Sequence, residues 1–226
     1  MFLRLTIRHY FDFGPDAAGV GSSLLENPQA WDDVRRSNAS FGFAVDRADL
    51  ISLGRGAPEL RARASTVLSI SGRFGSSIAS YGVGAAALEA QLLDLSPDLR
   101  LTMTEFAPLT LGYLRRLFAE QQVVEHDLRT DGPLPADLHL FNRIDSEFDD
   151  DQWHRILSRF AEPVLMVATE FLGPVGLARE VRDRFKRRAT QAGYTRTRGS
   201  FRALFGNRKT EQLQIGDLSG FLLLPS

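Results

Sequence analysis

Short apolar runs alternate with longer amphipathic segments from Thr66 to the end of the chain. Short apolar runs are typical of buried strands, and apolar residues recurring every three or four positions are typical of helices. The pattern predicts strands over 66–71, 99–106, 121–128, 135–144 and 162–172. It predicts helices over 85–95, 107–118, 145–160 and 176–193, the last ended by Gly193.

Strands that alternate with helices predict a parallel sheet with right-handed crossovers. The last two apolar segments, 194–201 and 218–225, have no helical pattern between them. We expect them to form an antiparallel pair at one edge. The predicted fold class is therefore α/β, with a seven-stranded, mainly parallel sheet, helices on both faces and an antiparallel C-terminal strand pair.

The first 63 residues show a less regular pattern. Residues 28–37 read as a short helix, with Asn27 as N-cap and Pro28 in the first turn, and a second helix is expected from Pro58. The segment holds no catalytic motif. We expect two parts, an N-terminal extension or cap over 1–63 and an α/β domain over 64–226.

Composition excludes several classes of function. The chain has 226 residues, no cysteine and a formal net charge of −1. Disulfides, cysteine–zinc sites and thiolate chemistry are thereby excluded. The near-zero net charge supplies no general attraction to nucleic acid or to anionic membranes. No apolar run is long enough to span a membrane, and the first residues lack the order of a signal peptide, so we expect a cytoplasmic protein.

Glycines and one acid mark the first two strand ends, where ligands bind in open α/β sheets. Ser71 and Gly72 follow the first predicted strand, and Gly82 and Gly84 come about ten residues later. Glu105 ends the second predicted strand, 21 residues after Gly84, close to the spacing of about 20 found between a glycine loop and a ribose-binding acid. The spacing predicts a cofactor loop that carries an insertion over 73–81, interpreted as a mobile lid beside the cleft.

Further polar and aromatic residues follow the other strands. Phe106 comes directly after Glu105, Asp127 and Leu128 end the third strand, and Asn142 ends the fourth. Because carboxyl ends of parallel strands meet at one edge, these residues are expected near the same ligand.

In this order, the segments "VLSIS…GVGAAALEAQLL", "LTMTEFAP", "VVEHDL" and "GYTRTRGSF…LSGFLLLP" resemble the class I S-adenosylmethionine-dependent methyltransferases, over about residues 64–226. The resemblance implies a Rossmann-like fold and S-adenosylmethionine as cofactor. The residues that it assigns to the cofactor are Ser71, Gly72, Gly82 and Gly84 on the methionine side, Glu105 on the ribose, and Phe106, Asp127 and Leu128 on the adenine, with Asn142 at the next strand end. Two features depart from the family pattern: Ser69 stands where an acid is usual, and the compact GxGxG is interrupted.

The resemblance implies methyl transfer, and a small-molecule acceptor is favoured by elimination. Thiolate attack on a pyrimidine is excluded without cysteine, and "FNRIDSEF" is not the Asn/Asp-Pro-Pro-aromatic motif of amine-directed nucleic-acid methyltransferases. Two alternatives stay open. One is a catalytically inactive, partner-binding scaffold. The other is an RNA-directed methyltransferase that uses the basic segment 175–210, which has eleven Arg or Lys and two acids.

The residues for proton transfer are less well defined by the sequence. His154, in the helix after the fourth strand, and Asp145, at its start, are the two candidates for a catalytic group. The acidic run over 145–151 has oxygen ligands of the kind that magnesium or calcium prefers. Carboxylates in a helical first turn are explained more simply by capping, so no metal site is predicted.

Overall fold

In the computed structural model, residues 4–11, 28–37, 43–186 and 191–225 are described. The strands are β1 (Thr6–Phe11), β2 (Ser77–Tyr81), β3 (Arg100–Glu105), β4 (Gln122–Glu125), β5 (Leu138–Asn142), β6 (Val164–Val167), β7 (Gln191–Arg196), β8 (Thr210–Ile215) and β9 (Leu218–Leu223). The helices are α1 (Pro28–Ser37), α2 (Arg47–Gly56), α3 (Pro58–Ser71), α4 (Ala87–Leu95), α5 (Pro108–Leu117), α6 (Asp150–Leu157), α7 (Pro174–Lys186) and α8 (Arg198–Ala203).

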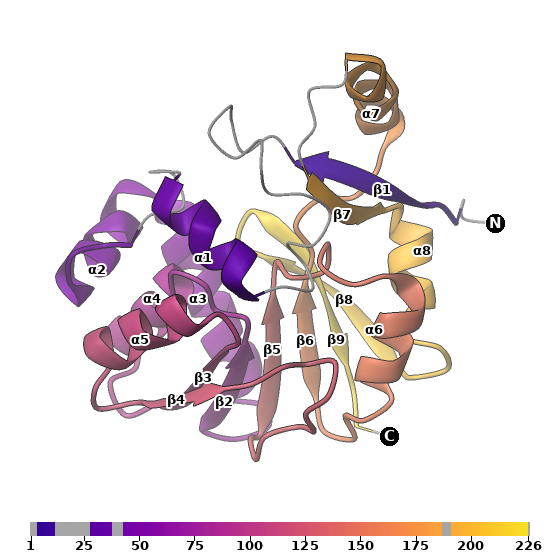
Figure 1. Cartoon of the computed structure of the whole chain (residues 1–226). Helices are drawn as coiled ribbons and strands as arrows, with labels where there is room; N and C mark the ends of the chain where they lie inside the picture. Colours follow the sequence, from indigo (N-terminus) through magenta and orange to yellow (C-terminus); the bar gives the residue numbers. More distant parts are fainter. Residues whose placement is uncertain (1–3, 12–27, 38–42, 187–190, 226) are drawn as a thin grey trace.

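A seven-stranded sheet in the order β4-β3-β2-β5-β6-β9-β8 forms the centre of the molecule (Figure 1). The first five of these strands are parallel, and β9 pairs antiparallel with both β6 and β8. The predicted fold class is confirmed. The strand order reverses between β2 and β5, so the ligand crevice of this sheet is expected beyond the carboxyl ends of these two strands.

Alternation along β5 explains why helices cover both faces of the sheet. Leu138 and Leu140 belong to one buried cluster with residues of α2, α3 and α4. Phe141, on the opposite face, belongs to a second cluster with residues of α6 and α8. Side chains in a strand point alternately to the two faces, so each face needs its own apolar cover.

The prediction of a first strand over residues 66–71 is wrong, and the parallel sheet begins later in the chain. Residues 66–71 lie in α3, where Ala64, Val67 and Ile70 are buried at helical spacing. The first strand of the parallel sheet is β2, inside the segment that was interpreted as an inserted lid. A short apolar run fits a strand and a buried helical turn equally well, which is why the pattern misled here. Residues 73–81 are therefore not a lid.

The predicted C-terminal pair is only partly right. The antiparallel pair is β8–β9, whereas β7 pairs antiparallel with β1 in a separate two-stranded sheet. Residues 198–201 of the predicted 194–201 strand lie in helix α8. The helix expected over 176–193 ends as α7 at Lys186, and α2 was not predicted. Within the part of the chain that the structure describes, no helix is long and apolar enough to cross a membrane.

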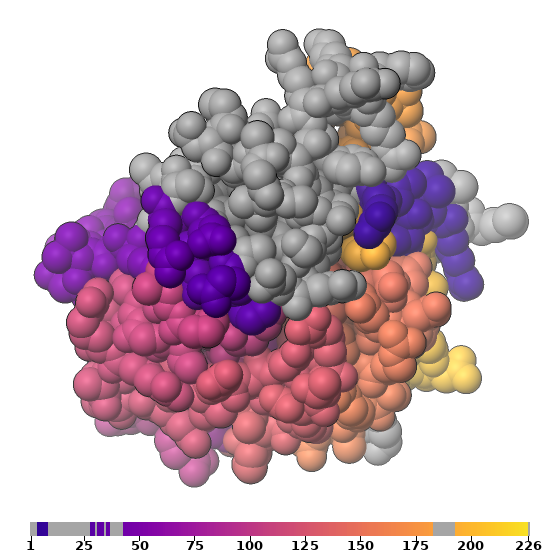
Figure 2. Space-filling model, viewed as in Figure 1, coloured from indigo at the N-terminus to yellow at the C-terminus, as the bar shows by residue number. Residues whose placement is uncertain are grey.

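Helix α1 is fastened to the sheet domain by one buried carboxylate. Asp32 is fully buried and accepts hydrogen bonds from the backbone N–H of Leu109 (2.9 Å) and of Thr110 (3.3 Å), both in the first turn of α5. The hydroxyl of Thr110 donates to the same carboxylate at 3.4 Å. A side chain from α1 thus caps the N-terminus of α5, and its negative charge meets the positive end of the helix dipole. Figures 1 and 2 show α1 resting on the body of the molecule.

Replacing Asp32 with alanine should lower the free energy of unfolding by about 1–3 kcal/mol, because buried N–H groups at the start of α5 would lose their acceptor. Chemical denaturation of the purified protein measures the change. Asp33→Ala is the matched control, since the neighbouring carboxylate is exposed in its ion pair with Arg36 and should cost less than about 1 kcal/mol. Equal losses in the two variants would contradict the capping role.

The buried carboxyl of Glu89 in α4 makes stability depend on pH. Burial raises its pKa from 4.5 to about 7, although the hydroxyl of Ser80 donates a hydrogen bond to it at 2.7 Å. A raised pKa means that the folded state holds a proton that the unfolded chain releases above pH 4.5. The contribution of Glu89 to the free energy of unfolding is therefore complete below pH 4.5 and is lost as the pH rises through about 7.

Glu89→Gln should remove this dependence. Between pH 4.5 and 8 the unaltered chain should lose on the order of 3 kcal/mol of unfolding free energy relative to the variant. Denaturation curves of both proteins across this range test the expectation. If the unfolding free energies of the two proteins change equally with pH, Glu89 does not change its protonation on unfolding.

Candidate functional site

A tight glycine loop joins β2 directly to α4. Gly82 and Gly84 have φ of +63° and +57°, values that side chains with a Cβ rarely adopt. The N–H of Val83 donates to the carbonyl of Thr104 at 3.1 Å, and this bond holds the loop against the end of β3. The predicted insertion before the loop does not exist, because the loop follows the strand at once.

Glu105 connects this loop to the end of β3. Its carboxylate accepts hydrogen bonds from the backbone N–H groups of Gly84 (3.1 Å), Phe106 (2.9 Å) and Ala107 (3.2 Å). The side chain is only 5% exposed, and burial raises its pKa despite these donors and the nearby charge of Arg35. Three donors on one carboxylate fix its position at the mouth of the crevice between β2 and β3.

Helix α1 contributes one aromatic ring and one cation to the same place. Trp31 and Arg35 lie one turn apart on α1, on either side of Asp32 in sequence, and both line the pocket. The guanidinium of Arg35 stacks near Trp31 and near Phe43, with its central carbon 5.9 Å and 5.5 Å from the ring centres. The Asp32 cap therefore holds two pocket residues in place as well as the helix.

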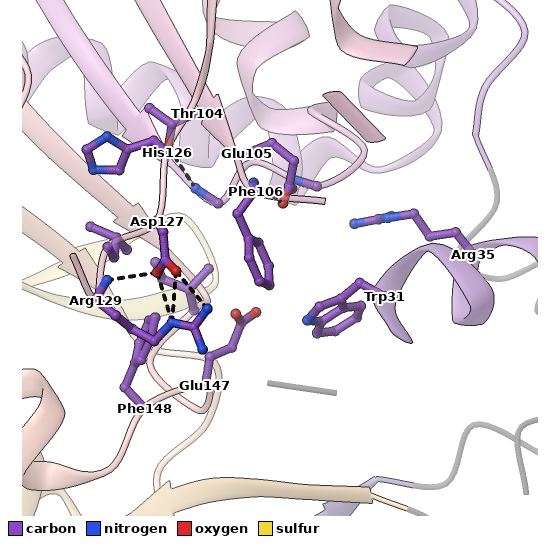
Figure 3. A pocket seen from close by; sticks show the side chains of 14 residues that line it. Trp31, Arg35, Thr104, Glu105, Phe106, His126, Asp127, Arg129, Glu147 and Phe148 are labelled. Atoms are coloured by element: carbon purple, nitrogen blue, oxygen red, sulfur yellow. Dashed lines mark hydrogen bonds and ion pairs between the residues drawn. The ribbon is translucent and has the colours of Figure 1, made fainter. Parts of the chain in front are cut away.

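The far wall of the pocket comes from the segment after β4. Asp127 is held by Arg129, whose guanidinium donates to both carboxylate oxygens at 2.7–3.1 Å. Burial alone would raise the pKa of Asp127, but the hydrogen bonds and charge of Arg129 lower it below its usual value. Arg129 also lies over the ring of Phe106, 5.8 Å from its centre. Phe106 thus presents one ring face to a cation (Figure 3).

The segment after β5 separates two cavities. Ile144, Glu147 and Phe148 line the pocket described so far. Asp145 and Ser146 line a second cavity of about 520 Å³, part of it open to solvent, which residues near the end of β6, in α7 and in β7 also surround. Arg143 has a φ of +61°, an uncommon conformation that accompanies the turn out of β5.

The first pocket has a volume of about 580 Å³, part of it open to solvent. Its lining residues are Trp31, Arg35, Gly82, Gly84, Thr104, Glu105, Phe106, His126, Asp127, Leu128, Arg129, Ile144, Glu147 and Phe148. They come from α1 and from the carboxyl ends of β2, β3, β4 and β5. The pocket therefore lies at the point where the strand order reverses, the usual place for a ligand in this architecture.

Six of the sequence-predicted cofactor residues meet in this pocket: Gly82, Gly84, Glu105, Phe106, Asp127 and Leu128. Ser71 and Gly72 do not line the pocket. They lie at the end of α3, before the amino end of β2, and the pocket lies at the carboxyl ends of the strands. They were expected at the carboxyl end of a strand because the first strand was predicted over residues 66–71. Asn142 ends β5 as expected but is not among the lining residues.

The two candidates for a catalytic group lie outside the first pocket. His154 is exposed on α6, and its Nδ1 is 2.7 Å from the carbonyl oxygen of Asp150. Asp145 is buried and accepts hydrogen bonds from the N–H (2.8 Å) and the hydroxyl (2.7 Å) of Thr169. Burial raises the pKa of Asp145 despite these bonds. Asp145 does face the second cavity, whereas His154 lines neither cavity.

Two other acids of the run 145–151, Asp149 and Asp150, have structural partners. Asp149 caps α6 by accepting from the N–H of Gln152 at 2.7 Å, as the capping interpretation expects. Asp150 bonds Thr6 of β1 and Arg196 of β7. Among the described residues, no group of three His, Cys, Asp or Glu side chains is arranged to hold a metal ion.

The pocket residues that sequence reasoning missed fall into two groups. Trp31 and Arg35 stand four positions apart in the predicted helix 28–37, a spacing that puts both on one helical face. Nothing in the sequence says that this face covers the pocket. Arg129, Ile144, Glu147 and Phe148 follow strand ends, and reading a few residues further beyond each strand would have found them.

Comparisons with known proteins agree with this geometry. No family model matches the chain, and no curated protein matches it in sequence. Solved structures do match. Human N-acetylserotonin methyltransferase in complex with SAM superposes with a TM-score of 0.62 at 15% identity, over 90% of this chain and 58% of that one. The mitomycin 7-O-methyltransferase MmcR gives 0.58 at 20% identity, over 90% and 60%, and PigF with SAH gives 0.61 at 15%, over 94% and 68%.

The chain thus spans 58% and 60% of the length of the first two of these neighbours. At identities of 15–20%, the likeness concerns the arrangement of the elements and not the chemistry of the site. The order of strands, the glycine loop after β2 and the acid at the end of β3 lead to the same conclusion as the superpositions. The chain has the fold of the class I S-adenosylmethionine-dependent methyltransferases.

Proposed function

We propose that the chain binds S-adenosylmethionine in the first pocket and transfers its methyl group to a small molecule. The observation that carries the proposal is the Glu105 carboxylate at the end of β3, hydrogen-bonded to Gly84 in the loop after β2. In such sheets, an acid at one strand end binds the ribose of a cofactor. A glycine loop at the neighbouring strand end lets the backbone approach the rest of the cofactor closely.

The shape of the glycine loop fits the cofactor. A Cβ on Gly84 would stand 2.9 Å from the guanidinium of Arg35, which already occupies the space beside this glycine. Gly82 is similarly close to Ile144, at 3.2 Å. Both positions therefore leave no room for a side chain, and glycine there presents only its backbone to the pocket.

Each pocket residue has a proposed role. Glu105 keeps lone pairs beyond its backbone bonds and would accept from the ribose hydroxyls. Phe106 would pack against the adenine, with Asp127 and Leu128 at its edge. Asp127 is already hydrogen-bonded to Arg129. It would therefore hold the segment after β4 in place as well as bond the adenine.

Residues 1–63 are proposed to act as a cap on the sheet domain. The support is α1, whose Asp32 fastens it to α5 while Trp31 and Arg35 reach the pocket. Helix α3 runs from Pro58 to Ser71 and continues the cap into the sheet domain without a break.

The cofactor supplies an electrophilic methyl group on a sulfonium. The chain has to hold the acceptor in line with it, exclude water and receive a proton where the acceptor is neutral. The second cavity, across the segment 144–148, is the proposed place for the acceptor, because it borders the same segment as the cofactor pocket. Small-molecule acceptors are supported by the neighbours named for N-acetylserotonin and mitomycin.

The scaffold alternative loses part of its support. It was motivated by an interrupted glycine loop and by Ser69 in place of an acid. The loop is continuous with β2, and Ser69 lies in α3 rather than in a strand.

Glu105→Ala should weaken the binding of S-adenosylmethionine by about 1.5–3 kcal/mol, the range for hydrogen bonds to a charged group. Isothermal titration calorimetry measures it. Glu125→Ala is the matched control, because Glu125 stands opposite Glu105 in the β3–β4 register but is exposed and outside the pocket. Unchanged affinity in the Glu105 variant, with an intact thermal transition, would remove the ribose assignment.

Gly84→Ala should reduce cofactor affinity for two reasons: its positive φ disfavours a Cβ, and the Cβ would meet Arg35. Gly206→Ala separates these reasons, because Gly206 has a φ of +56° with nothing within 4 Å of a Cβ. Both variants should lose about 1–2 kcal/mol of stability from backbone strain. Only the Gly84 variant should lose affinity in the same titrations, because Gly206 lies outside the pocket; an equal loss in both would mean that general destabilisation, and not the loop at the pocket, weakens binding.

A further inference from the structure

Glu147 is a carboxylate that the fold leaves without a partner inside the cofactor pocket. It follows β5 and lines the pocket from the side opposite α1. No hydrogen bond or ion pair of its carboxylate is found within the described ranges 4–11, 28–37, 43–186 and 191–225. Figure 3 shows the carboxylate pointing toward the space between the rings of Phe106 and Trp31.

The neighbours of Glu147 differ sharply from those of the other pocket carboxylates. Glu105 accepts three backbone N–H groups, and Asp127 is clamped by Arg129. Glu147 has neither kind of partner, although a partly buried carboxylate without a donor is costly. A group that keeps such a cost within a binding pocket is explained most simply by a ligand that supplies the missing partner.

The charges that face Glu147 come from several elements. Glu105 of β3 and Asp145 of its own segment are negative, and Arg35 of α1 is positive. The segment after β4 adds His126, Asp127 and Arg129 to the same pocket, with Asp127 and Arg129 neutralising each other. Glu105 and Glu147 thus line the same pocket, and Arg35 of α1 is the cation, among the described residues, whose charge acts on Glu147.

With both carboxylates ionised, their two negative charges would outnumber the one positive charge of Arg35 where the ligand binds. In agreement with this, the pKa of Glu147 is raised to about 8, first by burial and then by the charge of Glu105, while Arg35 opposes the rise. A positively charged ligand group would relieve the repulsion and hold Glu147 in its ionised form.

We propose that Glu147 binds a positively charged group of the cofactor, either the sulfonium or the ammonium of the methionine part. The inference rests on the proposed function, because it takes S-adenosylmethionine as the ligand of this pocket. Opposite charge is the shared chemistry, and the two groups are separated by choice of probe: S-adenosylmethionine carries both cations, S-adenosylhomocysteine only the ammonium, and 5′-methylthioadenosine neither.

The test is calorimetric titration of Glu147→Gln with these three compounds. The variant should bind S-adenosylmethionine roughly 30-fold or more weakly, because a charge partner of a buried cation is lost. Its affinity for 5′-methylthioadenosine should stay within about threefold, and this also shows that the pocket is folded. A matching loss for S-adenosylhomocysteine identifies the ammonium as the partner, and no such loss identifies the sulfonium.

Glu125→Gln is the control for net charge, because it removes one exposed carboxylate from the end of β4 outside the pocket. It should change all three affinities by less than about threefold. Glu147→Ala repeats the test with the carboxyl group removed altogether.

Proton release gives a second, independent measurement. Glu147 is mostly protonated near pH 7 when no ligand is bound, so pairing with a cation has to expel its proton. Titrations of S-adenosylmethionine in two buffers of different ionisation enthalpy should show more protons released by the unaltered chain than by Glu147→Gln.

Two results would overturn the inference. One is a Glu147→Gln variant whose affinities for all three compounds equal those of the unaltered chain. The other is an equal loss for all three, which would mean a general disturbance of the pocket. If the unaltered chain binds none of the compounds, the proposed function itself fails, and this outcome is distinct from the other two.

Discussion

The hydrogen bond from the N–H of Gly84 to the carboxylate of Glu105 is the contact on which the site depends. It joins the ends of two neighbouring parallel strands and requires a loop with positive φ at Gly82 and Gly84. The same carboxylate also accepts from the first residues after β3, so one buried group orders both the glycine loop and the approach to α5. A buried carboxylate in this position is tolerable only because all of these donors are present.

A second buried carboxylate extends this order to the N-terminal part of the chain. Asp32 caps α5, which begins just after the segment bonded to Glu105. Trp31 and Arg35 are thereby placed across the pocket from Glu147. The pocket thus consists of strand ends on one side and of helix α1 on the other, and the Asp32 cap links the two halves through the first turn of α5.

Sequence reasoning found the layers of the fold and half of the site, for physical reasons that can be identified. Helices α4, α5 and α6 and strands β3 to β6 follow clear periodicity and were predicted. The first strand was misplaced because "TVLSIS" in α3 is more apolar than "SIASY" in β2, whose central position in the sheet comes from its neighbours and not from its own composition. Gly82, Gly84 and Glu105 were still found, since their mutual spacing does not depend on where the strand begins.

What the sequence could not show is how charge is balanced in three dimensions. Arg35 lies 70 positions before Glu105, and 112 positions before Glu147, yet all three face one cavity. No local pattern reveals that Glu105 has donors while Glu147 has none among the described residues, because the donors of Glu105 are backbone groups set in place by the fold. The distinction matters for the chemistry: a satisfied carboxylate holds the architecture in place, whereas an unsatisfied one is available to a ligand. A methyl donor that carries positive charge is the kind of ligand that such a pocket favours, because that charge can meet the unsatisfied carboxylate.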